Sequence, residues 1–292
     1  MLRIERILCP VDFSHSSAAA YDYARSLARH YEAKLFVQHV VEQLVAIGDT
    51  HIPQEHLEEL YRRQQADAEE RLRQLASNVA DGVQQEFILQ RGGPAADSIL
   101  SFAEDQEIDL IVMGTHGRRG LDRLVMGSVL ERILRKTRSP LLAVRTAHSV
   151  AAGEPNQDVE IRRILFCTDF SEDSPRALEY ALSLALQYGS ELALLHVLES
   201  SRGERELEQH KQKARATLQE IVPEEVTQWA SITPVIRTGR AYQQIVRYAN
   251  EMTANLIVMG VRGRNPVDVA LFGSTTHRVV QLGPCPVLVV RT

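Results

Sequence analysis

Residues 6–14 read RILCPVDFS, and residues 163–171 read RILFCTDFS, so one nine-residue pattern occurs twice in this chain of 292 residues. Three more segments recur in the same order, at an offset of 157 or 146 residues: LFVQHV (35–40) with LALLHV (192–197), DLIVMG (109–114) with NLIVMG (255–260), and SPLLAVR (139–145) with CPVLVVR (285–291). Self-similarity at one long period indicates two tandem copies of one domain. The second copy lacks eleven residues, all of them between His39 and Gly93.

The segment that joins the copies reads TAHSVAAGEPNQDVE (146–160) and contains small and polar residues without periodicity. Such a composition is typical of a linker. We therefore predict a first domain over residues 1–147, a linker over 148–159 and a second domain over 160–292.

Within each copy, short apolar runs alternate with segments of helical periodicity. In the first copy we predict strands at Ile7–Val11, Lys34–Val40, Phe87–Leu89, Leu110–Met113 and Leu141–Val144, and helices at Ala18–Tyr31, 54–78, Ala95–Ala103 and Ser128–Arg135. The alternation predicts an α/β fold with helices on both faces of a parallel sheet. The continuously apolar strands suit a sheet that is covered on both sides. Ligands bind to such sheets beyond the carboxyl ends of the strands, where the strand order reverses.

The composition is that of a globular protein without a basic face. Hydrophobic residues make up 44%, charged residues 24%, and the net charge is −5. This balance argues against nucleic acid or an anionic membrane as a partner. The N-terminus lacks the features of a signal peptide, and no run of 18 apolar residues occurs, so we expect a cytoplasmic protein. Cys9, Cys167 and Cys285 form no CxxC pair, and we expect buried, reduced thiols.

A second repeated pattern carries the chemistry. Residues 113–134 read MGTHGRRGLDRLVMGSVLERIL, and residues 259–280 read MGVRGRNPVDVALFGSTTHRVV. In both, glycines follow an apolar strand and a Gly-Ser pair opens a helix. A helix N-terminus attracts anions, and glycines allow an anion to approach the backbone closely. Arg118 and the equivalent Arg264 add positive charge, so the pattern is suited to a polyphosphate.

A purely structural explanation remains open on physical grounds. The glycines can serve as turn residues, and Ser128 begins SVLE, a capping box in which Glu131 completes the cap. The second copy keeps the Gly-Ser pair but has Thr275, Thr276 and His277 after Ser274, so capping does not explain the whole repeat. Asp12 and Asp169 can likewise cap a helix or contact a ligand. His39 and His196 are expected to be core histidines. Neither a Walker loop nor a dinucleotide fingerprint is present.

The pattern G-x2-G-x9-G-[ST] occurs twice, together with DFS and HV strand ends and a P-[LV]-L-[AV]-V-R strand. In these motifs the chain resembles the universal stress protein family in its tandem two-domain form, over nearly its whole length. The resemblance implies two Rossmann-like (HUP-type) domains, each with a five-stranded parallel sheet of order 3-2-1-4-5. It also implies that each domain binds ATP or another adenine nucleotide, with Mg²⁺.

The resemblance further implies which residues contact the nucleotide. The glycines and serines would hold the phosphates and ribose, the aspartates would lie at the ribose–phosphate edge, and two valines would meet adenine through their backbone. The first site comprises Pro10, Val11, Asp12, Val40, Met113, Gly114, Gly117, Arg118, Gly127, Ser128 and Val129. The second comprises Thr168, Asp169, Val197, Met259, Gly260, Gly263, Arg264, Gly273, Ser274 and Thr275.

The implied function is an ATP-binding regulatory protein of the stress response rather than a dedicated enzyme. We predict no catalytic residue and no metal-ligating residue, and at most slow ATP hydrolysis. One alternative is an ATP-hydrolysing or adenylyl-transferring enzyme of a related α/β fold, although the S-G-G-x-D-S motif of such ligases is absent. The other alternative is a nucleotide-free interaction scaffold.

Two further expectations concern the sites and the assembly. Cys167 replaces Pro10, and Asn265-Pro266 replaces Arg119-Gly120, so we expect a looser turn and weaker binding in the second copy. The final strands, Leu141–Val144 and Val287–Val290, are apolar and would lie at sheet edges. We predict that they pack the two domains together as a pseudo-twofold pair, that a charge at Val289 would loosen this pair, and that whole chains can form homodimers.

Overall fold

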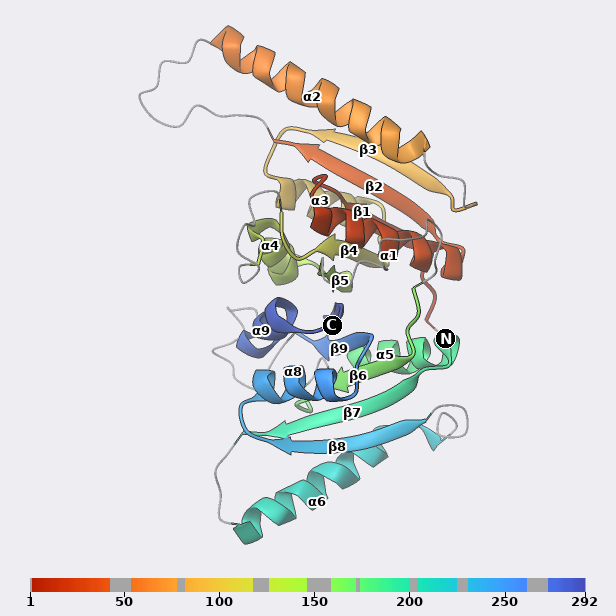
Figure 1. Cartoon of the computed structure of the whole chain (residues 1–292), viewed down its shortest axis with the longest axis vertical. Coiled ribbons are helices and arrows are strands. Elements are labelled where there is room, and N and C mark those ends of the chain that lie inside the picture. The colour runs from red at the N-terminus through yellow and green to blue at the C-terminus, as the bar shows by residue number, and fades with distance from the viewer. Residues whose placement is uncertain are drawn as a thin grey trace.

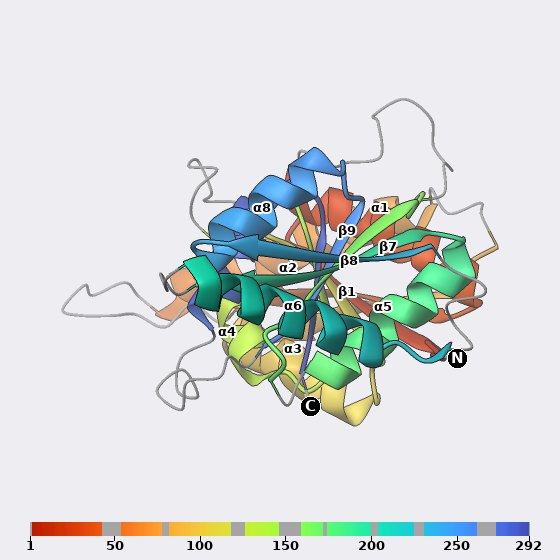
Figure 2. The same cartoon turned by 90° about the horizontal axis from the view of Figure 1, so that it is seen from below.

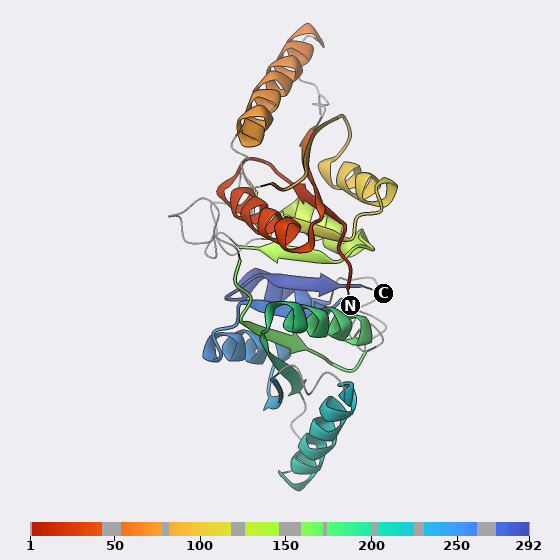
Figure 3. The same cartoon turned by 90° about the vertical axis from the view of Figure 1, so that its right-hand side faces the viewer.

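Two α/β halves lie end to end in an elongated molecule (Figure 1). The computed structural model describes residues 2–42, 54–77, 82–117, 126–145, 159–171, 174–199, 204–224, 231–261 and 273–291. The two long charged helices, α2 (Gln54–Ser77) and α6 (Glu204–Glu220), lie at the far ends of the molecule, and the last strand of each copy lies at its centre (Figures 1 and 3).

The first copy contains every element that its periodicity predicts, with small shifts at the ends. Its elements are β1 (Arg6–Pro10), α1 (His15–Tyr31), β2 (Lys34–Val41), α2, β3 (Gln85–Arg91), α3 (Ala95–Asp105), β4 (Leu110–Gly114), α4 (Ser128–Lys136) and β5 (Leu141–Val144). Helix α1 begins before Ala18 because Ser14 acts as its N-cap and accepts a hydrogen bond from the Ser17 backbone N–H. Serine is among the preferred residues at that position.

The second copy repeats the same order. Its elements are β6 (Arg163–Cys167), α5 (Ser174–Tyr188), β7 (Glu191–Leu198), α6, β8 (Ile232–Thr238), α8 (Ala241–Glu251), β9 (Leu256–Gly260), α9 (Ser274–Leu282) and β10 (Val287–Val290). Helix α5 begins at Ser174 with Pro175 in its first turn, a position that suits proline because the amide that it lacks has no helical partner there.

The ten strands of the described residues belong to one sheet, in the order β3-β2-β1-β4-β5-β10-β9-β6-β7-β8. The described strands of the two copies thus form one continuous mixed sheet, in which the last strands of the two copies are neighbours. The pairs within each copy are parallel, whereas β5 and β10 pair antiparallel, with Leu142 opposite Leu288. The physical reason is that β5 and β10 are wholly buried, and an apolar edge strand with unpaired peptide groups readily pairs with another. The sheet twists strongly from end to end (Figure 2).

Helices cover both faces of the sheet and bury one core on each. Side chains of α1, α2, α5 and α6 contribute to the first core, and side chains of α3, α4, α8 and α9 contribute to the second. Val289 belongs to the second core, where 3% of its surface is exposed. A charge at Val289 would therefore destabilise this core before it separated the two halves. The prediction that such a charge specifically loosens the pair of domains is wrong for this reason.

Two reciprocal hydrogen bonds also join the halves. The Leu2 backbone N–H donates to Ser183 Oγ at 3.0 Å, and the Val159 backbone N–H donates to Ser26 Oγ at 2.7 Å. Both donors and both acceptors are related by the repeat offset of 157 residues. The segment before the first strand of each copy therefore lies on the first helix of the other copy.

Candidate functional site

The turn that follows β1 places Asp12 at the carboxyl edge of the sheet. Asp12 Oδ1 accepts hydrogen bonds from the Ser14 backbone N–H at 3.0 Å and from Ser14 Oγ at 2.6 Å. Phe13 between them has φ 60°, a conformation that is strained for a residue with a side chain. Its ring lies 4.5 Å from the ring of His39. Ser14 rather than Asp12 is the N-cap of α1, and Asp12 holds that cap in place through its bonds to Ser14.

His39 is a buried residue that fixes this turn from the neighbouring strand. It lies in β2 with 8% of its surface exposed, and its Nδ1 is 2.6 Å from the Val11 carbonyl oxygen. A carbonyl only accepts, so Nδ1 carries the proton and donates. The Val11 backbone N–H donates in turn to the Gln38 carbonyl at 2.8 Å. The expectation of a core histidine is confirmed. Through its bond to Val11, His39 stabilises the turn that contains Asp12.

The peptide groups of Val40 face the open end of β1. The even-numbered residues of β2 form their backbone hydrogen bonds on the side of β1. For example, the Lys34 N–H donates to the Glu5 carbonyl oxygen at 2.8 Å. The odd-numbered residues form theirs on the side of β3. For example, the Gly92 N–H donates to the Val41 carbonyl oxygen at 3.1 Å. Within the described residues, β1 pairs with β2 only as far as Pro10 and Gln38. Val40 lies two residues further on, so its N–H and C=O point past the end of β1, into the region beyond the carboxyl ends of β1 and β4 that we call the crevice.

Gly117 and Gly127 come together beside Asp12. A Cβ atom built at position 117 would lie 3.1 Å from Asp12 Oδ2. A Cβ atom at position 127 would lie 3.7 Å from the Gly117 nitrogen and 3.5 Å from the Thr115 carbonyl oxygen. The Gly127 N–H donates to that carbonyl at 2.9 Å, which ties the start of α4 to the end of β4. Side chains at these two positions would fill the space between the carboxylate and the helix start.

Gly114 has a packing role of its own. A Cβ atom there would lie 2.6 Å from the backbone carbon of Ser16 and 2.7 Å from its carbonyl oxygen. Helix α1 can therefore approach the end of β4 only because position 114 has no side chain. Of the first-site glycines, Gly114 is explained by helix packing, while Gly117 and Gly127 surround the crevice.

Helix α4 presents unpaired amides to the crevice. The first amide with a helical partner is that of Glu131, which donates to the Gly127 carbonyl at 3.0 Å. The N–H groups of Ser128, Val129 and Leu130 therefore have no carbonyl within the helix. The capping-box interpretation is wrong, because Gly127 is the N-cap, no side chain caps it, and Ser128 is the first helical residue. Ser128 is exposed, and within the described chain no hydrogen bond engages its hydroxyl.

The remaining residues of the first site are less accessible. Pro10 and Val11 are buried at the end of β1, and Val129 is half-buried. Met113 is 7% exposed and packs in the core between the sheet and α3 and α4, below the crevice. Arg118 lies outside the described residues.

The second copy builds the same turn. The Ser171 N–H donates to Asp169 Oδ1 at 3.0 Å, and Phe170 again has φ 60°. His196 Nδ1 donates to the Thr168 carbonyl at 2.8 Å. The Phe170 N–H also donates to Thr168 Oγ1 at 2.9 Å, a bond that Val11 cannot provide in the first copy. The expected loosening of this turn by Cys167 is therefore not seen.

The second helix start differs in its packing. Helix α9 has Gly273 as its N-cap without a side-chain cap, and its first helical bond runs from the His277 N–H to the Gly273 carbonyl at 3.0 Å. Thr276 is buried, and its hydroxyl donates to the Gly260 carbonyl at 3.3 Å. A Cβ atom at position 273 would lie 3.0 Å from the Val261 carbonyl oxygen, which is tighter than at Gly127.

The other second-site residues follow the pattern of the first. Val197 is half-buried. In β7 the Leu195 carbonyl accepts from the Thr168 N–H on the side of β6 at 3.0 Å, and the Leu198 carbonyl accepts from the Gly239 N–H on the side of β8 at 3.0 Å. Because the direction alternates along the strand, the peptide groups of Val197 face the side of β6. Met259 is buried, Ser274 is exposed and Thr275 is half-buried. Gly263, Arg264 and the segment Asn265-Pro266, on which the expected weakness of the second site depends, lie outside the described residues.

Two residues near the first site were not singled out by their sequence. Thr115 is 1% exposed, and its carbonyl receives the Gly127 N–H. Gln38 is fully buried in β2. A signal for Gln38 exists, because it is a polar residue within an apolar strand and the repeat places Leu195 at the same position.

The thiols are shielded from chemistry. Cys9, Cys167 and Cys285 are free and buried, as expected. Burial raises the pKa of the Cys285 thiol to about 12 and raises the pKa values of Cys9 and Cys167 as well. A thiol is nucleophilic only as the thiolate, so all three are inert near neutral pH. Within the described residues, no group of three His, Cys, Asp or Glu side chains is arranged to hold a metal ion.

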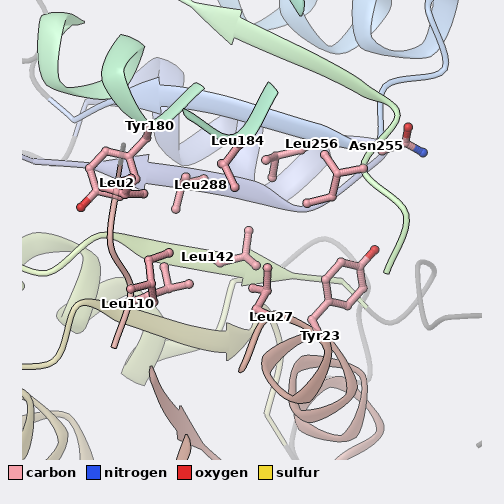
Figure 4. Close-up of a pocket in the computed structure, with 12 residues that line it drawn as sticks. Leu2, Tyr23, Leu27, Leu110, Leu142, Tyr180, Leu184, Asn255, Leu256 and Leu288 are labelled. Atoms are coloured by element: carbon pink, nitrogen blue, oxygen red, sulfur yellow. The ribbon is translucent and has the colours of Figure 1, made fainter. Parts of the chain in front are cut away.

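A small apolar cavity of about 20 Å³ lies between the halves (Figure 4), and none of its lining residues belongs to either predicted site. Its lining includes pairs related by the repeat: Tyr23 with Tyr180, Leu27 with Leu184, and Leu142 with Leu288. A cavity of this size holds about one water molecule and no nucleotide.

Among the described helices, none is long and apolar enough to cross a bilayer.

Comparison with known proteins gives consistent results for both halves. The family model of the universal stress protein family matches residues 3–145 and 160–291. A universal stress protein of Mycolicibacterium smegmatis is 24% identical over 296 residues, with 98% of this chain and 96% of that protein covered. Universal stress protein MJ0531 of Methanocaldococcus jannaschii is 30% identical over 145 residues, which cover 48% of this chain and 82% of that protein.

The fold has been observed before in a solved structure. The crystal structure of a universal stress protein from Archaeoglobus fulgidus has a TM-score of 0.72 and 24% sequence identity to this chain. The likeness covers 99% of both chains. At this identity the comparison shows the fold alone.

Proposed function

The chain belongs to the universal stress protein family, and from that premise we propose that it is a regulatory protein of the stress response that binds ATP in each of its two domains. The nucleotide would lie in the crevice at the carboxyl edge of each half of the sheet. The residues that we assign to these sites are the two sets that the repeated motifs predict.

The observation that carries the proposal is the convergence of Asp12, Gly117 and Gly127 beside the unpaired amides of α4. Amides at a helix start, together with the positive end of the helix dipole, bind phosphate groups. Asp12 Oδ1 accepts a hydrogen bond from Ser14, and a Cβ atom at position 117 would lie 3.1 Å from Oδ2, so the carboxylate borders the same space as Gly117. This arrangement supports a polyphosphate at the glycines with a ribose next to Asp12.

The peptide groups of Val40 and Val197 support recognition of adenine. Both point into the crevice beyond the first strand of their half. One N–H and one C=O on the same residue match the acceptor and donor that neighbour each other on an adenine base. The two half-buried valine side chains provide an apolar surface for the ring.

The strand order supports the location. We interpret the sheet as two halves of order 3-2-1-4-5, in which the order reverses between β1 and β4 and between β6 and β9. Open α/β sheets bind ligands at such reversals. Asp12 and Gly117 follow β1 and β4, and they lie on either side of the first reversal.

Mg²⁺ would accompany ATP. This ion binds nucleotides through phosphate oxygens with one or two carboxylates and several waters. We assign no protein ligand to the ion, which would be held by phosphate oxygens and waters. We propose a regulatory role, with any hydrolysis of the bound ATP slow, and we propose that the β5–β10 contact makes the two domains a pseudo-twofold unit.

Replacement of Gly127 tests the proposal. A side chain at position 127 has ordinary contact distances, 3.5 Å at the closest, so Gly127→Leu should fold. Its side chain would occupy the phosphate space, and isothermal titration with ATP and Mg²⁺ should show the loss of one of two sites. Glu131→Gln, one turn further along α4, is the matched control and should keep both. A wild-type protein without measurable ATP affinity would contradict the proposal.

A further inference from the structure

Gln38 is a buried amide without a hydrogen-bond partner. Its surface is fully buried, and neither Nε2 nor Oε1 has a partner in the described structure. Buried polar groups in native proteins are nearly always paired, so such a side chain requires an explanation. The fold itself does not require it, because the repeat places the buried Leu195 at the equivalent position of β7.

The Gln38 side chain lies on the face of the sheet that carries the crevice. Even residues of β2 face the core below α3 and α4, where Phe36 and Val40 both pack. Gln38 is in register with Pro10, and the pairing of Leu8 with Ile111 puts Pro10 level with Met113. The amide therefore lies beneath the crevice, on the same face as the N-terminus of α4.

The distance to the expected base position is short. Val40, whose peptide groups face the crevice, lies about 6.6 Å further along the strand, since each strand residue rises by about 3.3 Å. An extended glutamine side chain is shorter than that length, and a hydrogen bond of about 2.9 Å makes up the difference when the side chain leans along the strand. In the second copy Leu195 is in register with Cys167, and Cys167 is in register with Met259. The equivalent position beneath the second site therefore has no side-chain amide.

We propose that the Gln38 amide hydrogen-bonds to the adenine base in the first site, and that the first domain therefore discriminates for adenine more strongly than the second. The inference rests on the proposed function. A glutamine amide offers one acceptor and two donors, which can match the 6-amino group and a neighbouring ring nitrogen of adenine. Leu195 has no such groups, so the second site has only the Val197 peptide to read the base.

The experiment isolates the first site in the full chain. Ser274→Glu adds a carboxylate at the exposed start of α9, which repels phosphate from the second site. In this background, titration calorimetry compares ATP with purine riboside triphosphate, which lacks the 6-amino group. Gln38→Leu should weaken ATP binding by about tenfold or more and reduce the preference for ATP, because a lost partner leaves the buried groups unmatched.

Gln85→Leu is the matched control. Gln85 lies at the opposite end of β3, where its Oε1 accepts from Tyr21 at 2.7 Å, so the same change there should leave ATP binding unaltered. Unchanged affinity and unchanged preference in Gln38→Leu, with ATP still bound, would overturn this inference and leave the proposed function intact. A Ser274→Glu protein and a wild type that both fail to bind ATP would overturn both.

Discussion

Gly114 and Ser16 approach so closely that a methyl group at position 114 would lie 2.6 Å from the Ser16 backbone carbon. The contact joins the end of β4 to the first turn of α1. It means that the first glycine of the repeated motif is required for packing whether or not a nucleotide binds. The Ser16 hydroxyl also accepts the His116 N–H at 3.3 Å, which aligns the chain as it leaves β4.

Gly114→Ala should therefore destabilise the protein without a ligand. Overpacking against backbone atoms that cannot move aside costs about 1–3 kcal/mol. Urea unfolding of the ligand-free protein measures this loss. Gly127→Ala is the control, because its Cβ meets nothing closer than 3.5 Å. Equal stability of the two alanine variants would show that α1 adapts at Ser16.

The reciprocal bonds of Ser26 and Ser183 should stabilise the contact between the halves. Ser26→Ala would leave the buried Val159 N–H without its acceptor, at a cost of about 1–3 kcal/mol. Thermal unfolding measures the effect, with Ser101→Ala, an exposed serine of α3, as the control. If Ser26→Ala and Ser183→Ala both melt like the wild type, these bonds do not contribute to the contact.

Arg145 and Arg291 should link each half to a helix of the other. Arg145 Nη1 donates to the Gly283 carbonyl at the end of α9, at 2.8 Å, and Arg291 Nη1 donates to the Arg135 carbonyl near the end of α4, at 2.6 Å. Cations stabilise helix C-termini. We expect Arg291→Ala to lower the unfolding free energy by about 1 kcal/mol, and Arg291→Lys to restore part of it. A lysine variant no better than alanine would argue against a charged cap.

Stability should fall at alkaline pH because of the buried thiols. The pKa of Cys285 is raised from 9.0 to about 12 by burial, so the thiol contributes stability that is present below pH 9 and is lost as the pH rises towards 12. One such group gives a slope of about 1.4 kcal/mol per pH unit. Urea unfolding between pH 9.5 and 10.5 should show a shallower slope for Cys285→Ala. A slope identical to that of the wild type would contradict the assignment to Cys285.

Much of the fold follows from the sequence because it depends on periodicity. The apolar runs and the repeat predicted each strand and helix, and the DFS segment predicted a turn beside Asp12. The joining of ten strands into one sheet was not predicted in this form. A β-edge contact is made by backbone groups, so the sequence of Leu141–Val144 indicates an apolar edge but not its hydrogen-bonded register with Val287–Val290.

The site shows the same limit at the level of side chains. The sequence placed Asp12, Gly117 and Gly127 in one site through the family resemblance, and in the structure Gly117 lies beside both Asp12 and Gly127. It could not tell that Gly114 serves helix packing, because that depends on how closely α1 approaches β4. It also assigned a capping box to Ser128, since the pattern S-x-x-E does not reveal that Gly127 already occupies the N-cap.

The most direct test of two ATP sites is the stoichiometry of binding in four proteins: the wild type, Ser128→Glu, Ser274→Glu and the double variant. Both serines are exposed first residues of their helices, where a carboxylate favours the helix and repels phosphate. Equilibrium dialysis with ATP and Mg²⁺ should give about two, one, one and no nucleotides per chain. Full binding by the double variant, or none by the wild type, would contradict the account.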